Sequence, residues 1–211
     1  MRKKEYTVID LFAGAGGLSL GLYQSGWHGL FAIEKNAFAF ETLKHNLIEN
    51  KKHFDWPKWL PQTNHDINEI LKNYSKQLEA LQGKVDLVAG RPPCQGFSMA
   101  GKRVKDDVRN QLVFSYIKFI KLVQPKMILF ENVKGFTAKK FEPTRNRITE
   151  ILRELGYGEL QYAVLNSCDY GIPQNRERIW MFAMQGGVPD GFSIVPPKMK
   201  LTKRFGDFLD V

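Results

Sequence analysis

The chain has 211 residues, of which 43% are hydrophobic, and this is enough to bury the core of one compact domain. Its 31 Lys and Arg residues against 22 Asp and Glu residues give a net charge of +9 and a pI of about 9.5, which favours a polyanionic partner. With two cysteines and four histidines without metal-ligand spacing, the chain is not expected to have a disulfide framework or a bound metal. It has no long apolar run that could span a membrane, so we expect a soluble cytoplasmic protein.

Predicted strands and helices alternate along the chain. Strand-like runs are predicted at 6–12, 29–34, 85–89 and 127–130, and helical patterns at 18–26, 36–47, 68–82, 111–123 and 145–155. Runs at 159–165 and 178–184 indicate an antiparallel pair at one edge. This pattern predicts a doubly wound, mostly parallel α/β sheet, in which ligands bind beyond the carboxyl ends of the strands. Residues predicted at those ends are Gly14, Glu34, Asp66, Cys94 and Glu131.

A glycine-rich turn follows the first predicted strand in DLFAGAGGLSLG, residues 10–21. Glycines between a strand and a helix let the backbone turn sharply and let a ligand approach the helix N-terminus. Glu34 lies at the tip of the second strand, where a carboxylate can accept both hydroxyls of a ribose. We therefore predict an adenosine-containing cofactor, and this turn alone does not separate NAD from S-adenosylmethionine.

The segment GRPPCQGFS, residues 90–98, presents a thiol directly after a buried strand. Two prolines fix the backbone before Cys94, and polar and flexible residues follow it. A free thiol is only a few per cent thiolate at pH 7, so a nucleophilic cysteine needs activation by backbone dipoles or nearby cations. We interpret Cys94 as a nucleophile, whereas Cys168 is interpreted as a packing residue.

Two further segments carry chemistry near predicted strand ends. In ILFENVKGF the strand is expected to end at Glu131, whose carboxyl group can bind and protonate a ring nitrogen. In QNRER, Arg176 and Arg178 are two residues apart, so on a strand they would share one face and grip a phosphate or an oxyanion.

These segments together resemble the DNA (cytosine-5)-methyltransferases, in the order DLFAGAGG, FAIEKN, NHDI, GRPPCQGFS, ENVKGF and DYGIPQNRER. The resemblance implies a class I, Rossmann-like S-adenosyl-L-methionine-dependent methyltransferase domain over residues 1–185. In that family the thiol, here Cys94, adds to C6 of a cytosine flipped out of DNA, and C5 then takes the methyl group. Glu131 would hold N3 and the exocyclic amine, Arg178 would contact O2, and Arg176 would support a loop or a phosphate.

The same resemblance implies the remaining binding residues. Those lining the S-adenosyl-L-methionine pocket would be Phe12, Ala15, Gly16, Gly17, Glu34, Asp66, Ile67, Pro93 and Leu112. Those serving the DNA backbone or a closing loop would be Gln95, Ser98 and Arg109.

Two departures from the family pattern are visible. Position 91 is Arg where the family usually has Gly or an apolar residue. Residues 186–211 read as a linker toward a target-recognition domain and final motifs that the chain lacks, so we expect a fragment or split enzyme that needs a C-terminal polypeptide.

Three interpretations are carried forward. The first is a duplex-DNA cytosine methyltransferase of a restriction-modification system. The second is a tRNA cytosine-5 methyltransferase, against which stands the GFS that follows PPCQ. The third is a non-catalytic cofactor-binding or DNA-binding subunit, which would have no chemical need for thiol, carboxylate and arginines together. An NAD dehydrogenase is disfavoured because the PPC segment has no role in hydride transfer.

Overall fold

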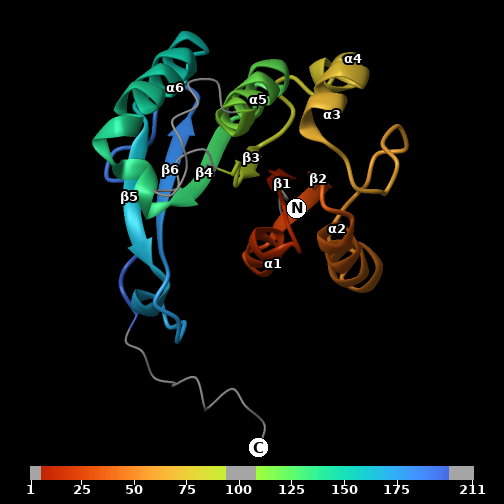
Figure 1. Cartoon of the computed structure of the whole chain (residues 1–211), viewed down its shortest axis with the longest axis horizontal. Helices are drawn as coiled ribbons and strands as arrows, with labels where there is room; N and C mark the ends of the chain where they lie inside the picture. The colour runs from red at the N-terminus through yellow and green to blue at the C-terminus, as the bar shows by residue number, and fades with distance from the viewer. Residues whose placement is uncertain (1–5, 94–107, 200–211) are drawn as a thin grey trace, which may run out of the picture. The chain divides into compact units, whose positions relative to one another are not determined.

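A computed structural model describes residues 6–93 and 108–199, apart from the side chains of 108–110. The chain divides into two compact units, Met1–Phe130 and Glu131–Val211. Strand β4 (Met127–Val133) runs across the division, and the hydrogen-bonded order of the strands is β2-β1-β3-β4-β6-β5 (Figure 1).

Parallel strands form the centre of the first unit. β1 (Tyr6–Leu11) lies between β2 (Trp27–Ile33) and β3 (Leu87–Gly90), and β3 pairs with the first half of β4. The register places Leu11 opposite Ile33 on one side and opposite Gly90 on the other. The carboxyl ends of three strands are therefore level, and the residues that follow them lie at one edge of the sheet.

Helices connect these strands. They are α1 (Gly17–Gln24), α2 (Ala37–Leu43), the π-helix η1 (Lys44–Asn50), α3 (Ile67–Asn73), α4 (Ser75–Glu79) and α5 (Val108–Val123). α2 and α3 begin after Asn36 and Asp66, whose side chains accept hydrogen bonds from the N–H groups of Ala39 and Asn68. Both α3 and α4 contact α5 (Figure 1).

Aromatic side chains fill much of the core of the first unit. The ring of Phe31, which is fully buried on β2, lies 5.5 Å from Trp59, 6.4 Å from Trp56 and 6.5 Å from Phe119, in edge-on arrangements. The polar 49–63 segment thus supplies tryptophans to the core.

The second unit carries the antiparallel edge. β5 (Gln161–Asn166) pairs with β6 (Glu177–Met184) from Gln161 opposite Phe182 to Asn166 opposite Glu177. The other elements are η3 (Lys134–Thr137), η4 (Lys139–Phe141), α6 (Glu142–Glu154) and η5 (Ser167–Asp169). Residues 186–199 are mostly irregular, and Met199 bridges back to Tyr170.

The mostly parallel α/β sheet with an antiparallel edge is confirmed. The helix predicted at 68–82 is instead two helices, because Tyr74 leaves helical geometry with φ −123° and ψ 22°. The helix predicted at 36–47 is α-helical only to Leu43 and continues as a π-helix from Lys44 to Asn50. No helix among the described residues is long and apolar enough to cross a membrane.

Candidate functional site

The turn after β1 has a left-handed backbone at three alternate residues. The φ angles are 58° at Phe12, 57° at Gly14 and 90° at Gly16, and α1 begins at the next residue. A Cβ atom on Gly16 would lie 2.7 Å from the side chain of Leu47, so the turn packs directly on the helix that follows β2. This close approach and the positive φ angles explain why glycines stand here.

Glu34 is fixed against this turn by backbone donors. Its Oε2 accepts a hydrogen bond from the N–H of Gly14 at 2.7 Å, and its Oε1 accepts one from the N–H of Asn36 at 2.7 Å. A carboxylate has two acceptor sites on each oxygen, so both oxygens can still accept the hydroxyls of a ribose. The predicted neighbourhood of Gly14 and Glu34 is confirmed.

Asp66 already has partners for both carboxylate oxygens. Oδ1 accepts the N–H of Asn68 at 2.8 Å, and Oδ2 lies 2.8 Å from the Nζ of Lys35. Burial raises the pKa of Asp66, but the hydrogen bonds from Lys35 and Asn68 outweigh it, so the pKa lies below its ordinary value. The carboxylate therefore stays ionised as an acceptor, with Lys35 as a partner that the sequence did not indicate.

The other predicted lining residues of the first unit differ in their burial. Ile67 is buried at the start of α3, whereas Ala15 and Gly17 are exposed. The half-buried members of the predicted pocket are Phe12, Pro93 and Leu112.

A buried carboxyl group lies beneath the turn. Asp10 on β1 is 1% exposed, and its Oδ2 accepts a hydrogen bond from the Oγ of Ser19 at 2.5 Å. Burial raises the pKa of Asp10 to about 6, against the opposing effects of the Ser19 hydrogen bond and the positive charge of Arg91. Neither Asp10 nor Ser19 was singled out from the sequence.

In the second unit, Glu131 and Arg178 form an ion pair. The Nε of Arg178 lies 3.4 Å from the Oε1 of Glu131, and the two side chains are 24% and 10% exposed. Arg178 also donates from Nη1 to the backbone oxygen of Glu177, whose own carboxylate bonds Lys134 at 2.8 Å. A carboxyl group and a guanidinium side by side present adjacent hydrogen-bonding groups to one edge of a planar ring.

Two expectations about local structure in this unit are wrong. β4 continues to Val133, so Glu131 lies within the strand rather than at its end. β6 begins at Glu177, so Arg176 precedes the strand and does not share a strand face with Arg178. Arg176 is exposed, and its backbone N–H bonds the side-chain oxygen of Asn166, which holds the segment just before β6.

Several predicted site residues lie outside the described residues. These are Cys94, Gln95 and Ser98, together with the side chain of Arg109. Their predicted roles remain predictions. Over the described ranges, no group of three or more His, Cys, Asp or Glu side chains is arranged to hold a metal ion.

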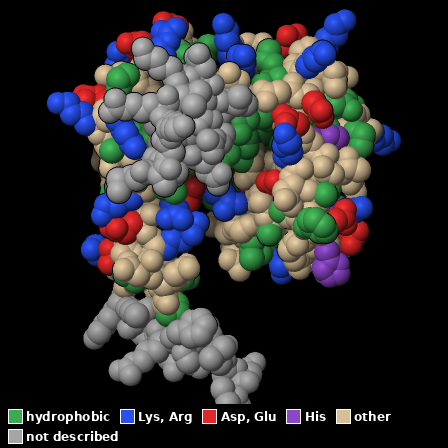
Figure 2. Space-filling view, in the orientation of Figure 1, with side chains coloured by type: hydrophobic (Ala, Val, Ile, Leu, Met, Phe, Trp, Pro, Cys, Tyr) green, Lys and Arg blue, Asp and Glu red, His purple; other side chains and the backbone are tan. Residues whose placement is uncertain are grey.

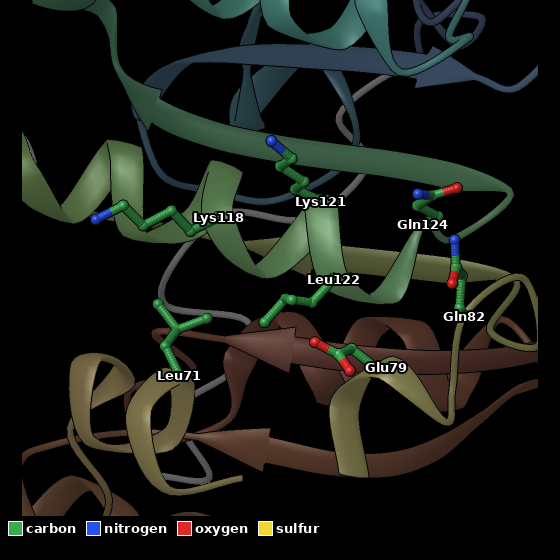
Figure 3. Close-up of a pocket in the computed structure, with 7 residues that line it drawn as sticks. All are labelled: Leu71, Glu79, Gln82, Lys118, Lys121, Leu122 and Gln124. Carbon is green, nitrogen blue, oxygen red and sulfur yellow. The ribbon is translucent and has the colours of Figure 1, made fainter. Parts of the chain in front are cut away.

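A separate groove of about 490 Å³ lies beside α5 in the first unit (Figure 3). Leu71 of α3 and Leu122 of α5 point toward each other across it, and its remaining lining residues are Glu79, Gln82, Lys118, Lys121 and Gln124. Gln82 and Gln124 precede β3 and β4, so this end of the groove lies at the amino ends of the strands. The predicted site lies at the carboxyl ends.

Comparison with known proteins gives a consistent result. The family model of the C-5 cytosine-specific DNA methylases matches residues 6–207. The chain is 36% identical over 183 residues to the Type II methyltransferase M.XorII of Xanthomonas oryzae, covering 86% of this chain and 41% of that protein. It is 33% identical over 186 residues to M.AquIA of Picosynechococcus, covering 84% of this chain and 71% of that protein.

Solved structures agree on the fold. A crystal structure described as a DNA modification methyltransferase of an Escherichia coli prophage is similar with a TM-score of 0.70 at 29% identity, over 93% of this chain and 52% of that chain. A mutant of Spodoptera frugiperda DNMT2 is similar with a TM-score of 0.65 at 26% identity, over 96% and 57%. The chain spans less than half the length of several of its curated relatives.

Proposed function

The chain belongs to the family of C-5 cytosine-specific DNA methylases, and from this premise we propose that it is the catalytic part of an enzyme that methylates C5 of cytosine in duplex DNA. Relatives named Type II methyltransferases support a place in a restriction-modification system. The methyl donor of this proposal is S-adenosyl-L-methionine, and the product is S-adenosyl-L-homocysteine.

The observation that carries the proposal is the Glu131 and Arg178 pair. N3 and O2 are neighbouring hydrogen-bond acceptors on the pairing edge of cytosine. In the proposal, a protonated Glu131 donates to N3 and the guanidinium of Arg178 donates to O2. The 3.4 Å between Arg178 Nε and Glu131 Oε1 fits such adjacent contacts. A base inside a duplex cannot reach groups of this kind, so the cytosine must leave the stack.

The residues around the glycine turn fit the proposed cofactor. Gly14 and Gly16 allow the left-handed backbone of the turn, and Glu34 keeps acceptor sites for a ribose. Ionised Asp66, half-buried Phe12 and buried Ile67 are the proposed lining of the pocket. When bound, the cofactor supplies an electrophilic methyl group. The protein side of this region orients the nucleoside and excludes water.

The proposed chemistry starts with Cys94. Its thiolate adds to C6 of the flipped cytosine, N3 takes a proton from Glu131, and Arg178 holds O2. These groups prevent negative charge from building on the ring, and C5 becomes nucleophilic. After C5 has accepted the methyl group, the C5 proton passes to a water molecule and N3 returns its proton to Glu131. Expulsion of the Cys94 thiolate then restores the aromatic base and the enzyme.

Contacts with DNA are proposed for Gln95, Ser98, Arg109 and Arg176. The net charge of +9 favours a polyanion, and Figure 2 shows Lys and Arg side chains spread over the visible face with acidic side chains among them. Because the relatives extend well beyond the matched region, we include a C-terminal polypeptide, in the same or a separate chain, as the supplier of base-edge recognition.

Duplex DNA that contains 5-fluorocytosine tests the proposal. Fluorine at C5 blocks the elimination, so with S-adenosylmethionine and the C-terminal polypeptide a covalent adduct should persist on a denaturing gel. Cys94→Ser should abolish the adduct, and the matched control Cys168→Ser should retain it. An adduct that survives Cys94→Ser would refute the assigned nucleophile.

Substrate comparison addresses the alternatives. Faster methyl transfer to tRNA than to duplex DNA would favour the tRNA enzyme. Cofactor or DNA binding without any methyl transfer, even when the C-terminal polypeptide is present, would favour a non-catalytic subunit.

A further inference from the structure

One peptide group in the glycine turn has a charged side chain bonded to each of its polar atoms. The N–H of Gly14 donates to Oε2 of Glu34 at 2.7 Å, and the oxygen of Ala13 accepts from Nη2 of Arg91 at 2.5 Å. Hydrogen bonds to ionised groups are stronger than neutral ones. Glu34 follows β2 and Arg91 follows β3, so the two side chains come from the strands on either side of β1.

Arg91 is built into the sheet edge rather than lying loosely on the surface. Its backbone N–H donates to the oxygen of Leu11 at 3.1 Å, which extends the pairing of β1 with β3 by one residue. A Cβ atom on Gly14 would lie 3.4 Å from Nη2 of Arg91, in ordinary van der Waals contact, so the guanidinium lies directly against the turn. Asp10, which is buried on β1, interacts through its negative charge with the positive charge of Arg91.

The turn needs such contacts because its backbone is strained. Phe12 is a bulky residue with φ 58°, a conformation that side chains other than glycine adopt at a free-energy cost. Rotating the peptide between Ala13 and Gly14 would break the bonds to Arg91 and Glu34 together. It would also break the bond from the N–H of Gly16 to the oxygen of Ala13 at 3.0 Å.

We propose that Arg91 is a positioning residue for the cofactor, and this rests on the proposed function. Arg91 holds the Ala13 oxygen while Glu34 holds the Gly14 N–H, so the turn and the ribose-binding carboxylate keep one geometry before a nucleoside enters. A turn that is already ordered loses less conformational freedom on binding. Arg91 thereby acts through the peptide and does not contact the cofactor itself.

The experiment uses the 211-residue chain and the variants Arg91→Met and Arg91→Lys. The control is Arg147→Met, which removes an exposed arginine that pairs with Glu150 on α6. Calorimetry measures the affinity for S-adenosylhomocysteine, NMR measures hydrogen exchange at the Gly14 amide, and urea unfolding measures stability.

Arg91→Met should weaken binding roughly ten-fold or more, the loss expected for one hydrogen bond to a charged group. It should also speed exchange at the Gly14 amide. Arg91→Lys should restore part of both, since lysine keeps the charge but not the planar fork. Arg147→Met should change neither quantity. A general loss of stability would accelerate many amides, whereas the proposal requires an effect centred on Gly14.

The two proposals fail separately. If the wild-type chain binds S-adenosylhomocysteine and Arg91→Met binds it equally well with unaltered Gly14 exchange, the role of Arg91 is refuted and the cofactor site stands. If the wild-type chain does not bind S-adenosylhomocysteine, the cofactor site is refuted. Comparison of exchange at the Gly14 amide in Arg91→Met and in the wild-type chain then decides by itself whether Arg91 holds the peptide. If Arg91→Met does not fold, the affinity for S-adenosylhomocysteine and the exchange at the Gly14 amide are measured in Arg91→Lys instead. Wild-type values of both quantities in Arg91→Lys would refute the proposal.

Discussion

His53 offers a test of how burial sets the pH dependence of stability. Its side chain is 1% exposed, its ring lies 4.5 Å from that of Phe54 and 5.4 Å from that of Tyr23, and neither ring nitrogen has a hydrogen-bond partner among the described residues. Burial, with a smaller contribution from the charge of His28, lowers the pKa of His53 to about 4. The folded chain therefore resists protonation at this residue.

The sign follows from where the protons bind. The unfolded chain has an ordinary histidine pKa of 6.5, so between pH 4 and 6.5 the unfolded state binds more protons than the folded state. The stabilisation is complete above pH 6.5 and is lost as the pH falls toward 4. From these two pKa values the loss between pH 8 and pH 5 is about 2 kcal/mol.

The variant His53→Leu removes the titrating group at similar volume. The free energy of unfolding in urea should be measured at pH 8 and at pH 5. The decrease in this free energy from pH 8 to pH 5 should be about 2 kcal/mol smaller in the variant than in the wild-type chain. His45→Gln is the control, because the side chain of His45 is 68% exposed. If His53→Leu kept the wild-type difference, the buried, neutral histidine would be refuted.

Three further predictions concern the sheet edge. Because the pKa of Asp10 is raised to about 6, protonation of Asp10 stabilises the folded chain below pH 3.8, and this stabilisation is lost as the pH rises through 6. In urea unfolding, the wild-type free energy of unfolding should therefore fall by about 2 kcal/mol between pH 4.5 and pH 8 on account of Asp10, and Asp10→Asn should not show this fall. Gly90→Ala should cost roughly 1–3 kcal/mol in the same assay, since the new Cβ would lie 2.6 Å from the ring of Tyr116, whereas Gly21→Ala, with nothing within 4 Å, should not destabilise the chain. Glu34→Gln should weaken S-adenosylhomocysteine binding at least ten-fold in calorimetry, and unchanged affinity would exclude the carboxylate from the site.

Local patterns predicted the parts of the fold that depend on neighbouring residues. The apolar run at 6–12 and the glycines after it are found as β1, the left-handed turn and α1. Glu34 was expected near Gly14 because parallel strands end at one edge of a sheet, and the two are hydrogen-bonded. The antiparallel pair of β5 and β6 was likewise expected from two late β-rich runs and is confirmed.

Contacts between distant residues were not predictable in this way. Arg91 is 78 residues from Ala13, and its departure from the family pattern indicated neither its effect nor its partner. Lys35 binds Asp66 across a long connection, which no periodicity reports. The start of β6 at Glu177, and hence the separate place of Arg176, depends on pairing with β5 rather than on the alternation of arginines.

The pair formed by Glu131 and Arg178 has a practical consequence for enzymology. Each side chain neutralises a partner that is largely withdrawn from water. Removing one leaves the other with a desolvation penalty that belongs to folding rather than to catalysis. Turnover numbers for variants at either position therefore gain chemical meaning only when divided by the fraction of molecules that remains native at the assay temperature.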